Sequence, residues 1–404
     1  MKTKKIGLLV WVLAGIALGG ALGAILPVWG IRALNTFRGM FLDFVKFFVP
    51  LIIIGFMIPA IADAGKGAGR MLFLTLGLAY ALTIISGCFS FGIAHFALPQ
   101  IMSDGVKMMA PQVSFPAYFS MSLSPVLSVG ASIVLAVLFG IGINARRTDA
   151  VLSIVKQFRD IVSWILSRIV MPMLPLYVLA VSADISASGR LAQVAHSFTA
   201  LMLLCVCMTL AITVLQYAVA GLASGRNPFR ALLNMLPAYF TGLGCCSSAA
   251  TMPVTIQQTV KNGVSASTAN LVVPICANVH LSGAICNMVA YAIGVMVLSG
   301  QQITFAAFVQ FILQASVVAV AGIPGGMVLA SASIAESVLG ISVDSYAMIV
   351  TLYMILDGVG TACNVAGSGA IAMIVDRFRG KDSPAEESMA SKVMAGRFQF
   401  AHAA

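Results

Sequence analysis

The chain has 404 residues, of which 60% are hydrophobic and only 9% are charged. A soluble domain carries about 25% charged residues, so this composition excludes a soluble globular protein and also a disordered one. The net charge of +10 comes from basic residues scattered between apolar runs, which is typical of membrane loops and argues against a nucleic-acid partner. We therefore predict an all-α polytopic protein that lies in membrane lipid.

The first 230 residues contain six apolar segments long enough to cross a bilayer, which takes roughly 20 residues each. These predicted spans are 6–27, 40–62, 72–98, 125–144, 161–182 and 193–223. Lys2, Lys4 and Lys5 precede the first of them, so we expect a cytoplasmic N-terminus and a retained helix rather than a cleaved signal peptide. Six crossings then return the chain to the cytoplasm.

Two later segments do not have the pattern of simple spans. Residues 232–262 contain Pro237 and a Gly-Leu-Gly-Cys-Cys-Ser-Ser run, which predicts two short helical arms that meet at a polar tip. Residues 302–340 repeat this signature, with an Ala-Gly-Ile-Pro-Gly-Gly tip at 321–326. We interpret both as re-entrant hairpins.

Two further segments alternate with the hairpins and are predicted to cross as broken helices. Residues 265–298 are interrupted at 278–283, and residues 344–375 are interrupted at 357–368. Backbone groups freed from a helix are tolerated at membrane depth only where protein or a water-filled cavity satisfies them. A duplicated pair of interrupted segments therefore indicates the binding site of a transporter.

The same pattern predicts three regions of the chain. We expect a six-span half at 1–230 that is mostly scaffold and trimerisation surface, a transport core at 231–381, and a cytoplasmic tail at 382–404.

Several of these motifs resemble the dicarboxylate/amino acid:cation symporter family, which has the glutamate-transporter fold. They are the Ser-Ser-Ala-Ala-Thr-Met-Pro run at 247–253, the Ala-Gly-Ile-Pro-Gly block at 321–325 and the segment 357–367, supported by Pro50-Leu-Ile-Ile-Ile and Asn227-Pro228. The resemblance covers nearly the whole chain. It implies a transporter rather than an enzyme, with eight transmembrane helices plus two hairpins, a homotrimer, an elevator motion of the core, and an inner (plasma) membrane location with both termini cytoplasmic.

Asp357 is the acidic residue that lies centrally in a long apolar segment. A charge at the bilayer centre costs roughly 3 kcal/mol on insertion scales, so it needs a partner or a function. In similar transporters an Asp at this position binds the ammonium group of the substrate, which favours an amino acid over a simple dicarboxylate. The alternative is a carboxylate that is protonated or satisfied by nearby hydroxyls.

Gly360 and Cys246 occupy the two positions where family members that carry acidic amino acids place an Arg. Burial of an unpaired substrate carboxylate would be costly, so a neutral amino acid is predicted. The alternative is that a basic residue reaches in from elsewhere. Arg168 and Lys46 are the other basic residues inside predicted spans, and both lie in the predicted scaffold.

Asn364 lies two helical turns after Asp357, on the same face, and matches the family Asn that donates to the substrate α-carboxylate. Ser247 and Ser248, at the first hairpin tip, are expected to add donors to that carboxylate, although small hydroxyls also serve in helix packing. The second hairpin tip is expected to act as a gate. The remaining predicted substrate contacts are Gly360, Thr361, Ile323 and Gly325.

Ion coupling departs from the family pattern, because Ser282 and Ser368 replace the two ion-binding carboxylates of sodium-coupled relatives. Hard cations prefer oxygen ligands, charged ones above all, so two of the three family sodium sites are weakened. Tyr80 and Thr83 match ligands of one weakened site. The third site uses backbone carbonyls of the second hairpin and Asn278, so we expect sodium as coupling ion and no other cofactor.

His280 stands at the centre of the broken seventh span. A histidine titrates near neutral pH, so one hypothesis is that a proton on His280 replaces a lost sodium. The alternative is a neutral histidine that is hydrogen-bonded to freed carbonyls.

The residues together predict a symporter that imports a small neutral amino acid, such as serine, threonine or alanine, with sodium or protons. One alternative is a symporter for dicarboxylates or acidic amino acids. A distant alternative is an intramembrane serine hydrolase, which would pair Ser247 or Ser248 with His280.

Overall fold

The computed structural model describes residues 8–64, 69–102, 115–121, 123–146, 148–189, 191–318 and 325–378. These residues form helices and no strand. The first half contains α1 (Leu8–Ile25), α2 (Val28–Ala64), α3 (Gly69–Ile101), α4 (Val129–Arg146), α5 (Asp149–Ile165), the π-helical turn η1 (Leu166–Val170), α6 (Met171–Ala187) and α7 (Leu191–Ser224). The second half contains α8 (Pro228–Cys245), α9 (Ser248–Lys261), α10 (Ala266–Val279), α11 (Ser282–Leu298), α12 (Phe305–Val318), α13 (Gly326–Ala330), α14 (Ala332–Leu339) and α15 (Val343–Arg377).

Six helical stretches within the described residues are long and apolar enough to cross a membrane. The outer helices also expose large apolar side chains, such as Leu203 and Leu222 on α7, at 65% and 87% of their surface. Such a surface would be unfavourable in water and is typical of contact with lipid. The chain is therefore a multi-pass membrane protein.

The span predicted at 161–182 is longer in the structure. α5, η1 and α6 form one stretch, Asp149–Ala187. α5 is amphipathic: Leu152 and Val162 are buried, whereas Asp160 is exposed. The mean hydropathy of an amphipathic helix is low even though one of its faces is apolar. Hydropathy alone therefore placed the start of this span too late.

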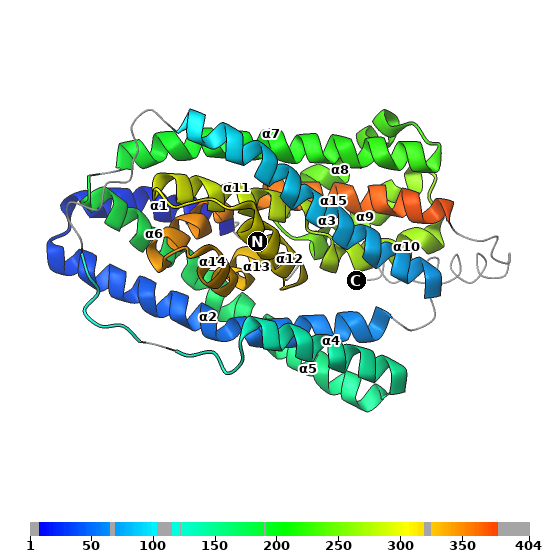
Figure 1. Cartoon of the computed structure of the whole chain (residues 1–404), viewed down its shortest axis with the longest axis horizontal. Coiled ribbons are helices and arrows are strands. Elements are labelled where there is room, and N and C mark those ends of the chain that lie inside the picture. The colour runs from blue at the N-terminus through cyan, green and yellow to red at the C-terminus, as the bar shows by residue number, and fades with distance from the viewer. Residues whose placement is uncertain are drawn as a thin grey trace, which may run out of the picture.

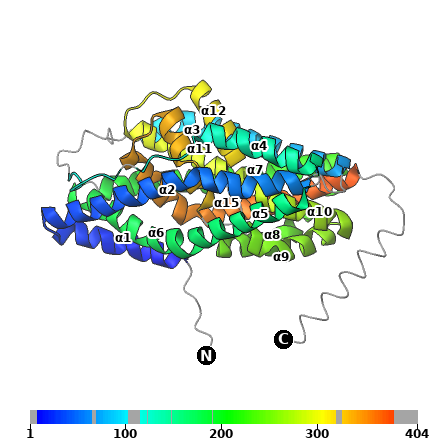
Figure 2. The same ribbon diagram turned by 90° about the horizontal axis from the view of Figure 1, so that it is seen from below.

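The helices pack in two groups, which Figures 1 and 2 show from two directions. In the first group, α2 packs against α4, α5 and α6, and α1 packs against α6. In the second, α15 lies at the centre and contacts α3, α7, α8, α10 and α11, and α11 also contacts α3 and α7. α3 runs obliquely across α10, α11 and α12 (Figure 1). The first-half helices α3 and α7 thus pack mainly against the second half of the chain.

A seam of three glycines joins α1 to α6. Gly15, Gly19 and Gly23 are spaced four residues apart, so they share one face of α1. A Cβ on Gly15 would lie 2.6 Å from the Pro175 carbonyl oxygen, and one on Gly19 would lie 2.9 Å from the Ser182 Cβ. Small residues at this spacing let two membrane helices approach to backbone contact.

α15 is one continuous helix from Val343 to Arg377, so the predicted break at 357–368 is wrong. The glycines that suggested a break are instead sites of close packing. A Cβ on Gly358 would overlap the Leu243 carbonyl oxygen of α8, and a Cβ on Gly369 would lie 2.8 Å from the Tyr217 hydroxyl of α7. Glycine weakens a helix by only about 1 kcal/mol, so burial among neighbouring helices is sufficient to keep α15 intact.

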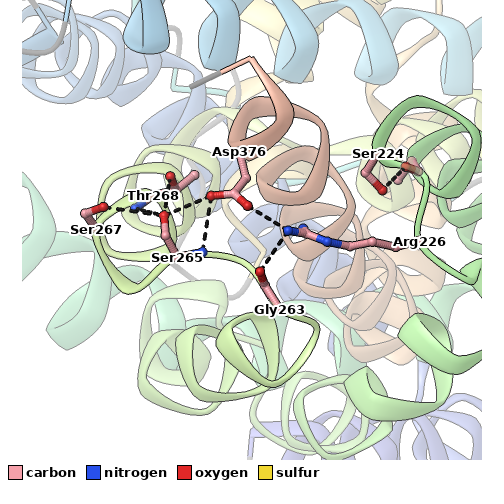
Figure 3. A network of polar contacts seen from close by, with 8 residues as sticks. Ser224, Arg226, Gly263, Ser265, Ser267, Thr268 and Asp376 are labelled. Carbon is pink, nitrogen blue, oxygen red and sulfur yellow. Dashed lines mark hydrogen bonds and ion pairs between the residues drawn. The ribbon is translucent and has the colours of Figure 1, made fainter. Parts of the chain in front are cut away.

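A polar network ties one end of the second group together (Figure 3). Arg226, between α7 and α8, donates to the Asp376 carboxylate at 2.7 Å and to the Gly263 carbonyl at 2.8 Å. The other Asp376 oxygen accepts from the Ser265 hydroxyl at 2.8 Å and from its amide at 3.2 Å. Ser265 in turn caps α10 by accepting from the Thr268 amide. The α7–α8 connection, the α9–α10 connection and the last turn of α15 are therefore joined at one carboxylate.

Candidate substrate and ion site

The connection between α8 and α9 consists of two residues, Cys246 and Ser247, so these helices form a hairpin. Cys246 has a φ of 52°, in the left-handed region that non-glycine residues seldom adopt, and it is the single such residue in the described part of the chain. Ser247 caps α9 by accepting from the Ala250 amide at 3.3 Å. Backbone strain of this kind persists where the surrounding structure enforces it, often at functional sites.

Asp357 lies buried in the middle of α15, with 8% of its surface exposed. One carboxylate oxygen accepts from the Gly325 amide at 2.8 Å, and Tyr353, one turn earlier, hydrogen-bonds to the same carboxylate. The first hairpin tip is also close, because a Cβ on the neighbouring Gly358 would lie 3.3 Å from the Cys246 sulfur. Residues from both predicted hairpins therefore meet around this carboxylate.

The described ion pairs leave this carboxylate without a basic partner. They are Arg38–Asp184, Lys46–Glu336, Arg159–Asp160 and Arg226–Asp376. Lys46, one of the two basic residues inside the predicted spans, is thus held by Glu336 on α14. A buried carboxylate with amide and hydroxyl donors alone remains suited to a cationic ligand.

Asn364 and Gly360 face α11 from α15. The Asn364 side-chain oxygen accepts from the Gly283 amide at 2.8 Å, which satisfies a free donor at the start of α11. A Cβ on Gly360 would lie 3.3 Å from the Ala284 amide nitrogen and 3.4 Å from the Asn287 Nδ2. A side chain at position 360 would therefore begin in close contact with α11.

The helical conformation is interrupted between α10 and α11, at His280 and Leu281. Thr83 on α3 satisfies one freed group, because its hydroxyl accepts from the Leu281 amide at 3.1 Å. The imidazole of His280 is buried and contacts the Ala79 carbonyl at 3.4 Å and the Ser282 hydroxyl at 3.2 Å. The break is thus filled by side chains and carbonyls of α3 and α11.

Gly367 makes room for this cluster. A Cβ there would overlap both the His280 Nε2 and the Gln216 Oε1, so the imidazole and the Gln216 amide lie against the same point of α15. Gln216 is 3% exposed, and neither of its side-chain polar atoms has a hydrogen-bond partner among the described residues. Buried amides without partners are rare, which marks this polar cluster as unusual.

The other predicted site residues differ in burial and in the groups that they contact. Ser248 and Thr361 are buried, and Tyr80 is half-buried on α3. The Ser368 hydroxyl donates to the Asn364 carbonyl at 2.9 Å, and the exposed Asn278 side chain donates to the Pro274 carbonyl at 2.8 Å, within its own helix. The predicted contact Ile323 lies outside the described residues. Where the structure describes the chain, it contains no cluster of three His, Cys, Asp or Glu that could hold a metal ion.

Comparison with known families gives the identity of this fold. The model of the sodium:dicarboxylate symporter family matches residues 8–378, nearly the whole chain. The chain belongs to the sodium:dicarboxylate symporter family.

Similar members of this symporter family have names that concern neutral amino acids. The serine/threonine transporter SstT of Streptococcus thermophilus is 23% identical over 375 residues, which cover 87% of this chain and 90% of that protein. Neutral amino acid transporter B(0) of Homo sapiens is 31% identical over 168 residues, 40% of this chain. Neutral amino acid transporter A of Bos taurus is 30% identical over 171 residues, 42% of this chain. The matches span 31% and 32% of these two mammalian relatives.

Three buried polar residues around the candidate site were not predicted from the sequence. Tyr353, Gln216 and Asn287 each place a polar side chain in the buried contacts described above. A signal was present for the two amides, since each stands alone within a long apolar run. For Tyr353 there was none, because a tyrosine in an apolar helix is common packing material.

Proposed function

We propose that this symporter takes up a small neutral amino acid, similar to serine, threonine or alanine, together with a cation. The observation that carries the proposal is the buried Asp357 carboxylate, which has hydrogen-bond donors but no basic partner among the described ion pairs. Such a carboxylate binds an ammonium group well, because the attraction between opposite charges is strong in a dry site. The names of the serine/threonine and neutral amino acid relatives agree with this substrate class.

The substrate α-carboxylate would bind at the other side of the site. Asn364 on α15 and the start of α9, with Ser247 and Ser248, supply amide and hydroxyl donors. The N-terminus of a helix favours an anion, because its backbone amides point outward and its dipole is positive there. Thr361 and the second hairpin tip, with Ile323 and Gly325, would complete the enclosure.

Sodium is the proposed coupling ion. Its ligands would be backbone carbonyls at the break, near Asn278, and hydroxyls such as those of Thr83, Ser282 and Ser368, with Tyr80 nearby. These are neutral oxygen donors, so affinity for sodium is expected to be modest. His280 is the proposed site of a proton that replaces a second cation. His280→Gln tests this proposal, because uptake that has the same pH dependence in the variant and in the wild type contradicts it.

The proposed architecture has eight transmembrane helices and two re-entrant hairpins, α8–α9 and α12–α14. The core that moves would include α3 and α7, because they pack against α11 and α15. A homotrimer held by the first helix group, an elevator motion, and cytoplasmic termini in the inner membrane complete the proposal. The imidazole of His280 contacts the Ala79 carbonyl and the Ser282 hydroxyl, which lends no support to a hydrolase that pairs it with the α9 serines.

Uptake into proteoliposomes tests the proposed function directly. Serine, threonine, alanine, aspartate and succinate are supplied with an imposed sodium or proton gradient. We expect accumulation of the neutral amino acids that depends on sodium and is lost in Asp357→Asn. If aspartate or succinate outcompetes serine, the competing assignment to acidic substrates holds instead.

A further inference from the structure

Asn287 is a buried polar side chain that no part of the proposed site uses. It lies within α11, where nearly every residue is buried and apolar, and 2% of its surface is exposed. Its amide oxygen has no hydrogen-bond partner among the described residues. Such an oxygen is costly to bury, so a ligand that supplies a donor would be favoured there.

The position of Asn287 follows from the pairing of α11 with α15. Gly283 contacts Asn364, as described above, and Tyr291, two turns further along α11, packs against Tyr353 with ring centroids 6.4 Å apart. The two helices are therefore antiparallel along this seam. Asn287 lies between the two contacts, one turn from each.

The two ends of this seam are the two ends of the proposed substrate site. Asn364 is the proposed partner of the α-carboxylate, and Tyr353 touches the carboxylate of Asp357, the proposed partner of the ammonium group. The Asn287 amide lies 3.4 Å from the Cβ that Gly360 lacks. Asn287 would therefore be in van der Waals contact with the first atom of any side chain at position 360.

We propose that Asn287 is a specificity-determining residue, whose amide oxygen accepts a hydrogen bond from the side-chain hydroxyl of a serine- or threonine-like substrate. This inference rests on the proposed function and narrows its substrate class to hydroxyl amino acids. Alanine has no donor and would leave the oxygen unpaired, so the site discriminates against it. A site built to bind a hydroxyl rejects the analogue that lacks it, because a buried polar group is then left without a partner.

Binding affinities of serine and alanine for purified Asn287→Leu and wild-type protein test this inference. Leucine has a similar size and no polar atom, so the preference for serine over alanine is expected to fall about tenfold, equivalent to about 1.4 kcal/mol. Asn270→Leu is the matched control, because Asn270 is exposed and bonds only within its own helix. An unchanged preference in Asn287→Leu overturns the proposal.

Two further measurements keep the test decisive. The wild-type protein should prefer serine to 2-aminobutyrate, which carries a methyl group in place of the serine hydroxyl, and the absence of such a preference overturns the proposal even if the variant fails to fold. Failure of the general function is separate, since it would appear as wild-type protein that binds neither serine nor alanine. Binding of both with equal affinity would retain the function and overturn the role of Asn287.

Discussion

Gly358 provides a sharp test of how the first hairpin is held against α15. A Cβ at this position would overlap the Leu243 carbonyl oxygen, lie 3.2 Å from the Leu243 carbonyl carbon and lie 3.3 Å from the Cys246 sulfur. Ordinary contacts of a Cβ are 3.4–4 Å. Because the overlapping atom belongs to the backbone of α8, no change of side-chain rotamer relieves the clash, and Gly358→Ala must move the end of α8.

The magnitude can be isolated with a matched glycine. Gly77, inside α3, has no atom within 4 Å of a built Cβ, so Gly77→Ala gains only helix propensity, about 0.5–1 kcal/mol. Gly358→Ala gains the same propensity but adds overpacking strain of about 1–3 kcal/mol. The difference between the two variants therefore measures the strain alone.

Thermal unfolding in one detergent and serine affinity are the two measurements. Gly358→Ala is expected to unfold at a lower temperature than Gly77→Ala. If roughly 1.4 kcal/mol of strain is relieved by moving Cys246 away from Asp357, Gly358→Ala should also bind serine about tenfold more weakly than Gly77→Ala does. Equal unfolding temperatures and equal affinities in the two variants would refute the argument from backbone contact.

Three other substitutions test separate parts of the structure. Asp357→Asn keeps an acceptor for the backbone amide that it meets but removes the charge, so calorimetry should show serine affinity reduced about a hundredfold or more; a change under threefold would exclude an ammonium contact. Gly367→Ala displaces His280, so the sodium concentration for half-maximal uptake should rise severalfold, and an unaltered sodium dependence would separate this histidine from coupling. Asp376→Asn leaves Arg226 without its charged partner, so the free energy of unfolding should fall by about 1–3 kcal/mol; no loss of thermal stability would mean that the network is dispensable.

Much of the fold was predictable because breaks in apolar periodicity have few explanations inside a membrane. The two helical arms predicted within 232–262 are joined at Cys246 and Ser247, inside the Gly-Leu-Gly-Cys-Cys-Ser-Ser run, and the interruption predicted at 278–283 occurs at His280 and Leu281. In both cases a helix breaker or polar group stands where backbone must be satisfied by something other than its own helix.

The continuity of α15 was not predictable, because a glycine has two uses in a membrane helix. Gly358 and Gly369 do not bend the chain; they admit α8 and the Tyr217 hydroxyl to close contact. Sequence composition does not distinguish an opening in the helix from a contact across it, since both require the missing Cβ. Only the positions of the neighbouring helices separate the two uses.

The candidate site shows the same division between local and long-range information. Asp357 stood out because an isolated charge in an apolar segment has a high cost that can be read locally. The contact with Gly325 and the position of Asn287 depend on which helices meet across the core, which no spacing along the chain encodes.

The glycine seam between α1 and α6 has a practical consequence for spectroscopy. Backbone meets backbone there, and Trp11, one turn before Gly15 on α1, is 55% exposed. The other two tryptophans of the chain, Trp29 and Trp164, are on α2 and α5, in the same helix group. The fluorescence of the native tryptophans therefore reports on the first helix group. One tryptophan introduced into α9 would be the sole indole from α7 to α15, so its signal would report on the second group.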